Sequence, residues 1–245
     1  MSQILVVEKL TKTFTMHTLH GRLIKGCSDV TFGLEQGEIL GLSGPSGTGK
    51  SSILKCVYRA YLPTRGSVIY ESEKLGRVDL AEVDEHSMII LRQYEIGYVT
   101  QFLNVVPRVS AVDTVAEPLL QRGVALEEAR RKAADLLDRL HIPANLFDAC
   151  PVTFSGGEQQ RVNFAAGVIS CPRLLLLDEP TASLDVKTRQ AVIDILNNLK
   201  RQGTSMIAIF HDQEIMSAVA DKLYLVGSEK AAISRGTLFS DSACR

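Results

Sequence analysis

A glycine-rich turn lies between two segments that are expected to form regular structure. The turn reads Gly44, Pro45, Ser46, Gly47, Thr48, Gly49, Lys50 and Ser51. Residues 37–43 before it read as a short apolar strand, and a helix is expected from about Lys50. Glycines let the backbone wrap around phosphates with its N–H groups inward, and a helix N-terminus adds positive potential. Lys50 can then place its charge between the β- and γ-phosphates of a nucleotide, and Ser51 offers a hydroxyl to Mg²⁺.

An apolar run from Leu174 to Leu177 ends in two carboxylates, Asp178 and Glu179. Such a run is expected to form a strand buried in a sheet, and the end of that strand delivers Asp178 to the nucleotide. Asp178 suits Mg²⁺, directly or through water, and Glu179 suits the task of polarising an attacking water. Beside a phosphate-binding turn, this pair predicts that the nucleotide is hydrolysed.

A second glycine turn precedes another expected helix and consists of Ser155, Gly156, Gly157 and Glu158. It too can bind phosphate at a helix N-terminus. One chain with a single nucleotide-binding turn has no obvious use for a second phosphate site. The pattern therefore suggests a phosphate that is shared between two chains.

The composition is that of an ordinary soluble globular protein. Of the 245 residues, 45% are hydrophobic, and 27 basic residues against 28 acidic ones give a net charge of -1, which disfavours a general nucleic-acid binder. No run approaches the roughly 20 apolar residues of a membrane-spanning helix, and the N-terminus lacks a secretory signal. Five cysteines without C-x-x-C spacing predict reduced thiols rather than a metal site. We therefore expect a cytoplasmic protein without direct membrane insertion.

Alternation of strand and helix patterns predicts an α/β fold with a parallel sheet covered by helices. Strands are expected at residues 4–10, 30–34, 66–71, 76–80, 173–178 and 204–210. Residues 101–170 read as mostly helical, with one face formed by Leu126, Ala129, Ala133, Leu136, Leu137 and Leu140. A further amphipathic helix points inward through Val192, Ile195, Leu196 and Leu199. We expect one domain, with residues 1–100 and 166–245 as its core and about 101–165 as a helical subdomain.

The motifs of this chain, in their order along the sequence, resemble those of ABC-type ATPases, and the resemblance covers nearly the whole chain. Residues 155–159 resemble the signature loop of that family. Gln101 resembles the glutamine that contacts Mg²⁺ and senses the γ-phosphate, and His211 resembles the switch histidine that contacts the γ-phosphate. Phe14 resembles the aromatic residue that stacks on adenine, and Asp185, in the segment 183–185, belongs to a loop resembling the one that crosses to the partner subunit.

The resemblance implies the fold of an ABC-type P-loop NTPase, with a mostly parallel core sheet, an antiparallel β subdomain and a helical insertion. It also implies a head-to-tail dimer with itself or a related subunit, and ATP and Mg²⁺ as the bound species. Lys50, Asp178 and Glu179 would then act together with Ser155 and Gly157 of a partner chain. The isolated monomer is accordingly expected to be a poor ATPase.

Three segments resemble the PhnL-type subunits of the bacterial carbon–phosphorus lyase system: residues 56–63, 100–111 and 210–214. This resemblance implies a subunit of α-D-ribose 1-methylphosphonate 5-triphosphate synthase that works with other phosphonate-lyase subunits. The step assigned to that family replaces the adenine of ATP by a phosphonate and breaks a bond at ribose C1′. The motif residues surround the γ-phosphate instead, so the hypothesis is that ATP closure gates a larger complex.

Two alternatives stay open. ATPase subunits of lipoprotein-release transporters share much of the same pattern, and residues 101–107 suit a permease as well as a soluble partner. A nucleotide-dependent assembly clamp with little turnover is the third reading, against which Glu179 and His211 argue. The chain also departs from the family pattern at Ala166, where an arginine is usual, which weakens one charged contact behind the signature helix.

Overall fold

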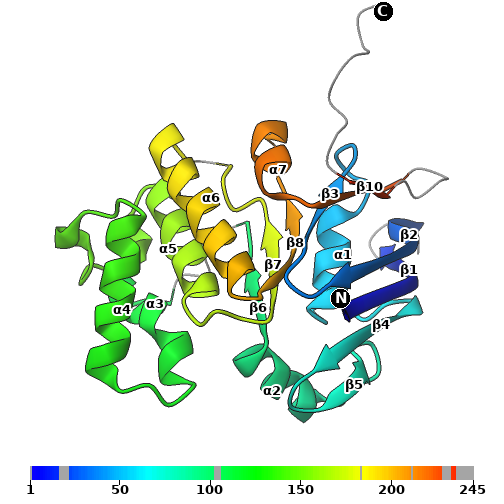
Figure 1. Cartoon of the computed structure of the whole chain (residues 1–245), viewed down its shortest axis with the longest axis horizontal. Coiled ribbons are helices and arrows are strands. Elements are labelled where there is room, and N and C mark those ends of the chain that lie inside the picture. Colours follow the sequence, from blue (N-terminus) through cyan, green and yellow to red (C-terminus); the bar gives the residue numbers. More distant parts are fainter. Residues whose placement is uncertain are drawn as a thin grey trace, which may run out of the picture.

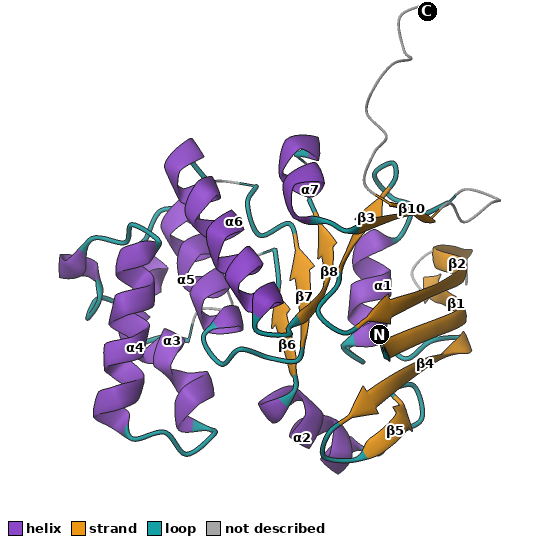
Figure 2. Ribbon diagram, viewed as in Figure 1, coloured by secondary structure: helices purple, strands orange, loops and turns teal. Residues whose placement is uncertain are grey.

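The computed structural model describes residues 2–16, 22–101, 106–182, 184–210, 212–227 and 233–235. These residues form a six-stranded sheet and a four-stranded sheet. The six-stranded sheet lies at the centre of the molecule, with the four-stranded sheet on one side and a group of helices at the opposite end (Figures 1 and 2). Among the described residues, no helix combines the length and apolar character needed to cross a membrane.

The central sheet has the strand order β10-β9-β3-β8-β7-β6. Its strands are β3 (Ile39–Ser43), β6 (Ile96–Val99), β7 (Leu174–Asp178), β8 (Ser205–Ile209), β9 (Lys222–Leu225) and β10 (Ile233–Arg235). All neighbours pair in parallel except β10, which runs antiparallel to β9. Parallel strands need crossover connections, which here cover both faces of the sheet with other elements.

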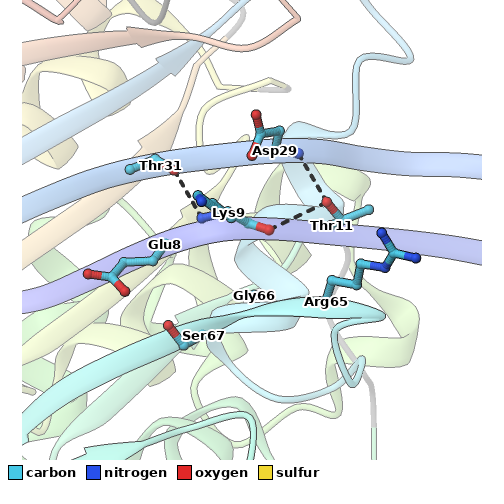
Figure 3. Close-up of a pocket in the computed structure, with 8 residues that line it drawn as sticks. All are labelled: Glu8, Lys9, Thr11, Asp29, Thr31, Arg65, Gly66 and Ser67. Atoms are coloured by element: carbon cyan, nitrogen blue, oxygen red, sulfur yellow. Dashed lines mark hydrogen bonds between the residues drawn. The ribbon is translucent and has the colours of Figure 1, made fainter.

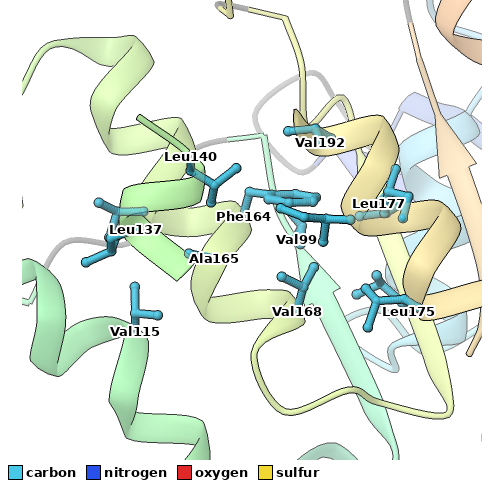
Figure 4. Close-up of a cluster of buried hydrophobic side chains, with 14 of the residues drawn as sticks. Val99, Val115, Leu137, Leu140, Phe164, Ala165, Val168, Leu175, Leu177 and Val192 are labelled. Atoms are coloured by element: carbon cyan, nitrogen blue, oxygen red, sulfur yellow. The ribbon is translucent and has the colours of Figure 1, made fainter. Parts of the chain in front are cut away.

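The apolar run of β7 is explained by burial on both faces of the sheet. Leu175 and Leu177 pack in a cluster with α3 (Ala111–Leu120), α4 (Leu126–Arg139), α5 (Gly156–Val168), α6 (Val186–Arg201) and α7 (Gln213–Val219). Figure 4 shows these two leucines near Val99 and Phe164. Leu174 and Leu176 lie in the other cluster, with α1 (Lys50–Val57) and the four-stranded sheet. Side chains alternate between the faces along a strand, so both sets must be apolar.

The four-stranded sheet is antiparallel and has the order β2-β1-β4-β5. It consists of β1 (Gln3–Met16), β2 (Arg22–Glu35), β4 (Arg65–Ser72) and β5 (Gly76–Asp79). Buried side chains of β1, β2 and β4 share a cluster with Ile53, Leu54 and Val57 of α1. This packing brings β1 and β2 beside the helix that follows the glycine turn.

The predicted fold class is confirmed: an α/β cassette with a parallel sheet and an antiparallel β subdomain. The periodicity of α4 was correct for Ala129, Ala133 and Leu137, which are buried, but Leu126 at its start is exposed. Sequence patterns missed two elements, α2 (Glu85–Tyr94) and β6. The four residues of β6 are too few to display a clear period. The predicted division of the domain at residue 166 stays a prediction, and α5 runs through that position as one helix.

Candidate nucleotide-binding site

The glycine turn connects β3 directly to α1, as its sequence predicts. Gly44, Gly47 and Gly49 have φ angles of +138°, +81° and +94°, which side chains other than hydrogen rarely tolerate. A Cβ on Gly49 would lie 1.5 Å from the carbonyl oxygen of Gly26, so only glycine fits there. Gly49 also has no side chain with which to cap α1. The first N–H groups of a helix lack intrahelical partners, which suits them to bind an anion.

Lys50 folds back over the turn. Its ammonium group donates hydrogen bonds to the carbonyl oxygens of Gly44 at 2.7 Å and Pro45 at 2.9 Å. These contacts hold a positive charge at the mouth of the turn. A pocket of about 380 Å³ opens there, lined by Phe14, Ile24, Lys25, Gly26, Ser46, Gly47, Gly49, Lys50, Ser51, Ser52 and Glu179.

The pocket therefore unites the glycine turn with two predicted residues that are distant in sequence, Phe14 and Glu179. Sequence reasoning missed Ile24 and Lys25. Ile24 lies opposite Phe14 in the β1–β2 pairing, a register that the tertiary structure sets. The Phe14 and Tyr61 rings pack edge-on, with their centroids 5.1 Å apart. The Lys12 ammonium lies 5.1 Å from the centroid of the Phe14 ring.

Asp178 lies at the end of β7 and is only 5% exposed. The Ser51 hydroxyl donates to its Oδ1 at 2.9 Å, and the Tyr98 hydroxyl donates to its Oδ2 at 3.2 Å. Burial, together with the negative charge of Asp178, raises the pKa of the Tyr98 phenol, which stays protonated and able to donate. The strand end thus presents a buried carboxylate to the first turn of α1.

Glu179 follows in a left-handed backbone conformation, with φ of +54°. Its N–H donates to the carbonyl oxygen of Ile209 at 3.0 Å. A non-glycine residue held in this region costs of order 1–3 kcal/mol, and such strain concentrates at functional sites. The Gln101 side chain donates to Glu179 Oε2 at 3.2 Å, while Gln160, which sequence reasoning missed, donates to the Glu179 carbonyl oxygen at 2.8 Å.

The residues present fit a Mg²⁺ ion. Mg²⁺ prefers hard oxygen ligands and is commonly held by one or two carboxylates together with substrate phosphates. Ser51 and Asp178 bring a hydroxyl and a carboxylate into direct contact, and the Gln101 amide lies beside the next carboxylate. The part of the chain that the structure describes has no group of three or more His, Cys, Asp or Glu that could form an all-protein metal site.

The signature-like turn caps α5 rather than reaching the pocket of its own chain. The Ser155 hydroxyl accepts a bond from the Glu158 N–H at 3.4 Å and donates to Glu158 Oε2 at 2.7 Å. The Ser155 N–H also donates to Glu158 Oε2, at 2.8 Å. The hydroxyl and then this N–H lower the pKa of Glu158. Neither Gly156 nor Gly157 lines the pocket beside Lys50.

Asp185 caps α6 in a similar manner. Its carboxylate accepts bonds from the Thr188 N–H at 3.0 Å and the Thr188 hydroxyl at 2.9 Å, in that order the main causes of its lowered pKa. Asp185 is exposed and does not line the pocket. His211, the second predicted catalytic residue, lies outside the described residues.

A larger hollow, of about 830 Å³, lies on the four-stranded sheet and includes no residue of the glycine turn; Figure 3 draws its lining residues. It is lined by Glu8, Lys9, Thr11, Asp29, Thr31, Arg65, Gly66 and Ser67. Irregular pairing of β1 with its neighbours opens the hollow, and Lys9 and Asp29 both have positive φ angles. None of the predicted site residues lines it, so size alone does not identify the functional site.

Comparison with known proteins agrees with this geometry. Residues 27–182 match the family model described as ABC transporter. The chain is 34% identical over 213 residues to the lipoprotein-releasing system ATP-binding protein LolD of Legionella pneumophila (strain Paris), covering 86% of this chain and 90% of that protein. It is 35% identical over 206 residues to the putative phosphonates utilization ATP-binding protein PhnK of Escherichia coli (strain K12), covering 82% and 80%.

The fold is also that of a solved cassette. A dimeric structure of a post-hydrolysis state of the ATP-binding cassette MJ0796, bound to ADP and Pi, superimposes with a TM-score of 0.85. Sequence identity is 25%, and the match covers 96% of this chain and 100% of that one. The family match spans more than half of the chain, and the curated relatives align over most of their length. The chain belongs to the ABC transporter family, as an ATP-binding subunit.

Proposed function

We propose that the chain hydrolyses Mg-ATP in the cytoplasm, at a site that a second ABC subunit completes. The observation that carries this proposal is that Lys50 and Glu179 line one pocket, together with Ser51, whose hydroxyl donates to the buried Asp178. Lys50 would neutralise the β- and γ-phosphates, and the backbone N–H groups of residues 44–51 would surround them. Phe14 would stack on the adenine ring, since it lines the same pocket.

Ser51, Asp178 and Gln101 would hold a Mg²⁺ ion. When bound, this ion supplies charge neutralisation of the phosphate oxygens. Glu179 would accept a hydrogen bond from the attacking water, and its left-handed backbone aims the carboxylate away from the buried strand and toward the pocket. Gln101 donates to this carboxylate and would orient it. His211 would contact the γ-phosphate.

The proposal of a site shared by two chains is supported by where the signature turn and Asp185 lie within one chain. Ser155, Gly156, Gly157 and Glu158 lie outside the pocket that contains Lys50, and Asp185 is exposed at the start of α6. A similar cassette, MJ0796, is a dimer in a state bound to ADP and Pi. In a head-to-tail dimer, the signature turn of each chain would meet the nucleotide of the other.

The Glu179→Gln variant tests the proposal. It should bind ATP normally and lose at least about 100-fold in turnover, because an amide cannot act as a general base. Phosphate release and ATP binding are measured on the same preparation, with Glu82→Gln as the control at an exposed carboxylate outside the pocket. Undiminished turnover in Glu179→Gln would show that the base is another residue. A wild-type protein that binds ATP without turnover in its complex would favour an assembly clamp.

We propose that the ATPase serves the phosphonate carbon–phosphorus lyase machinery, associated with formation of ribose 1-phosphonate 5-triphosphate. Support comes from residues 56–63, 100–111 and 210–214 and from the similarity to PhnK. The second candidate is the ATPase subunit of a lipoprotein-release transporter, which the similarity to LolD favours about equally. The two candidates predict different partners, soluble phosphonate-lyase subunits or an integral-membrane permease.

A further inference from the structure

Tyr98 belongs to the same sheet face as the carboxylate at the end of β7. In the parallel pairing of β6 with β7, Tyr98 lies opposite Leu176. Asp178 is two residues beyond Leu176 on its strand, so the side chains of all three project to one face. Leu176 packs on that face with residues of α1, the helix whose first turn contains Ser51.

Both oxygens of Asp178 have a hydroxyl partner. Ser51 donates to Oδ1 at 2.9 Å, and Tyr98 donates to Oδ2 at 3.2 Å. The two donors come from different elements, α1 and β6, and each binds a different oxygen of the carboxylate. Ser51 belongs to the proposed metal site and would have to turn its hydroxyl oxygen to the ion, whereas Tyr98 has no such second task.

The Tyr98 ring packs against a second aromatic ring at a tilt of 50°. Its centroid lies 5.0 Å from the ring of Tyr58, the residue that follows α1. The guanidinium of Arg92, on α2, lies 4.6 Å from the centroid of the Tyr58 ring. Arg92 also donates two hydrogen bonds to the Tyr58 carbonyl oxygen, at 3.3 and 2.9 Å. The phenol of Tyr98 is therefore fixed in place before any ligand arrives.

We propose that Tyr98 is a positioning residue for the metal-binding carboxylate. Its hydroxyl donates to Oδ2 of Asp178 and would leave Oδ1 for a Mg²⁺ ion once the Ser51 hydroxyl turns away. This inference rests on the proposed function and goes beyond it, because nothing in the motif pattern assigns a role to Tyr98. Hydrogen-bond partners of metal-binding side chains fix their orientation, and their removal typically weakens metal affinity by about 10- to 100-fold.

The test uses Tyr98→Phe in the full-length protein, with Mn²⁺ as the probe. Electron paramagnetic resonance measures free Mn²⁺ in titrations of protein saturated with ADP. Tyr98→Phe should weaken nucleotide-dependent Mn²⁺ binding by about 10-fold. Affinity for ADP in excess EDTA should stay at the wild-type value, because the phosphate-binding turn is untouched. The matched control is Tyr58→Phe, which removes a neighbouring hydroxyl and keeps the ring that packs against Tyr98.

Three outcomes would overturn the inference: wild-type Mn²⁺ affinity in Tyr98→Phe, an equal loss in Tyr58→Phe, or an equal loss of ADP affinity in EDTA. Wild-type Mn²⁺ affinity in Tyr98→Phe would mean that the Tyr98 hydroxyl has no role. Either of the other two results would mean that the substitution acts through changed packing of the site. Tyr98→Met removes the hydroxyl differently and should reproduce the loss if Tyr98→Phe does not fold. Failure of the proposed function looks different, since wild-type protein with ADP would then bind no more Mn²⁺ than ADP alone.

Discussion

At the residue scale, charge neutralisation at the glycine turn depends on one side chain. Lys50 is held over the turn by two carbonyl oxygens, and a nucleotide phosphate would replace these weak partners with full negative charge. Lys50→Ala should therefore reduce ATP affinity by at least about 100-fold, since hydrogen bonds to charged groups contribute roughly 1.5–3 kcal/mol each. Isothermal titration calorimetry measures the loss. Lys55→Ala, on the same helix, should bind ATP within about twofold of wild type, and equal losses in both would contradict the assignment.

Two glycines of the turn allow a matched comparison. Both have positive φ angles, but a Cβ would meet the Gly26 carbonyl at position 49 and nothing within 4 Å at position 47. Gly47→Ala should cost about 1–2 kcal/mol in the free energy of unfolding, from backbone strain alone. Gly49→Ala should cost at least about 3 kcal/mol, because overpacking adds to that strain. Urea denaturation of both variants checks the order, and equal costs would show that the turn relaxes freely.

At the element scale, α5 begins with a reciprocal pair of contacts between Ser155 and Glu158. Ser155→Ala removes the cap and should lower the free energy of unfolding of the monomer by about 1 kcal/mol. Chemical denaturation at neutral pH measures this change. Glu158→Gln keeps an acceptor at the same position and should cost less than Ser155→Ala, because an amide oxygen still reaches the Ser155 N–H.

The same contact predicts a pH dependence. Because the pKa of Glu158 is lowered in the folded chain, its carboxylate stabilises the fold above the pKa of the unfolded state. That contribution is lost as the pH falls through the lower, folded pKa. Wild-type stability should therefore decline more on acidification than that of Glu158→Gln, in which this titration is absent. If the free energies of unfolding of the two proteins fell in parallel on acidification, Glu158 would not contribute to the pH dependence of stability.

At the scale of the whole molecule, the proposed composite site requires a second chain. Glu179→Gln with ATP should dimerise in analytical ultracentrifugation, because bound nucleotide is retained. Adding Gly156→Glu should abolish the dimer, since it places a negative charge where the partner's phosphates would lie. A Cβ at position 156 meets nothing within 4 Å, so the fold leaves room for a side chain to begin there. The control Gly156→Ala adds only that Cβ, and a dimer that survives Gly156→Glu would exclude this interface.

Partners distinguish the two biological candidates. Tagged Glu179→Gln protein is recovered with Mg-ATP from its native host, grown on a phosphonate as sole phosphorus source, and partners are identified by mass spectrometry. Recovery of soluble phosphonate-lyase subunits is the expected result. Recovery of an integral-membrane permease would instead assign the chain to a transporter of the lipoprotein-release type, with the same ATP chemistry.

The sequence by itself determined the family and the α/β class, and it also carries the proposed chemistry of the glycine turn and the acidic pair. These features are local, because a turn of fixed spacing or a strand ending in carboxylates is written in consecutive residues. The short strand β6 was missed because its four residues carry little periodic signal.

Only the tertiary structure decided which distant residues meet. Ile24 reaches the pocket through its register with Phe14. Gln160 reaches Glu179 from α5, and Tyr98 on β6 reaches Asp178 on the neighbouring strand β7. Such contacts depend on strand order and on which face a side chain occupies. Both are set by the packing of the whole sheet between its two apolar clusters, and no short segment of sequence encodes them.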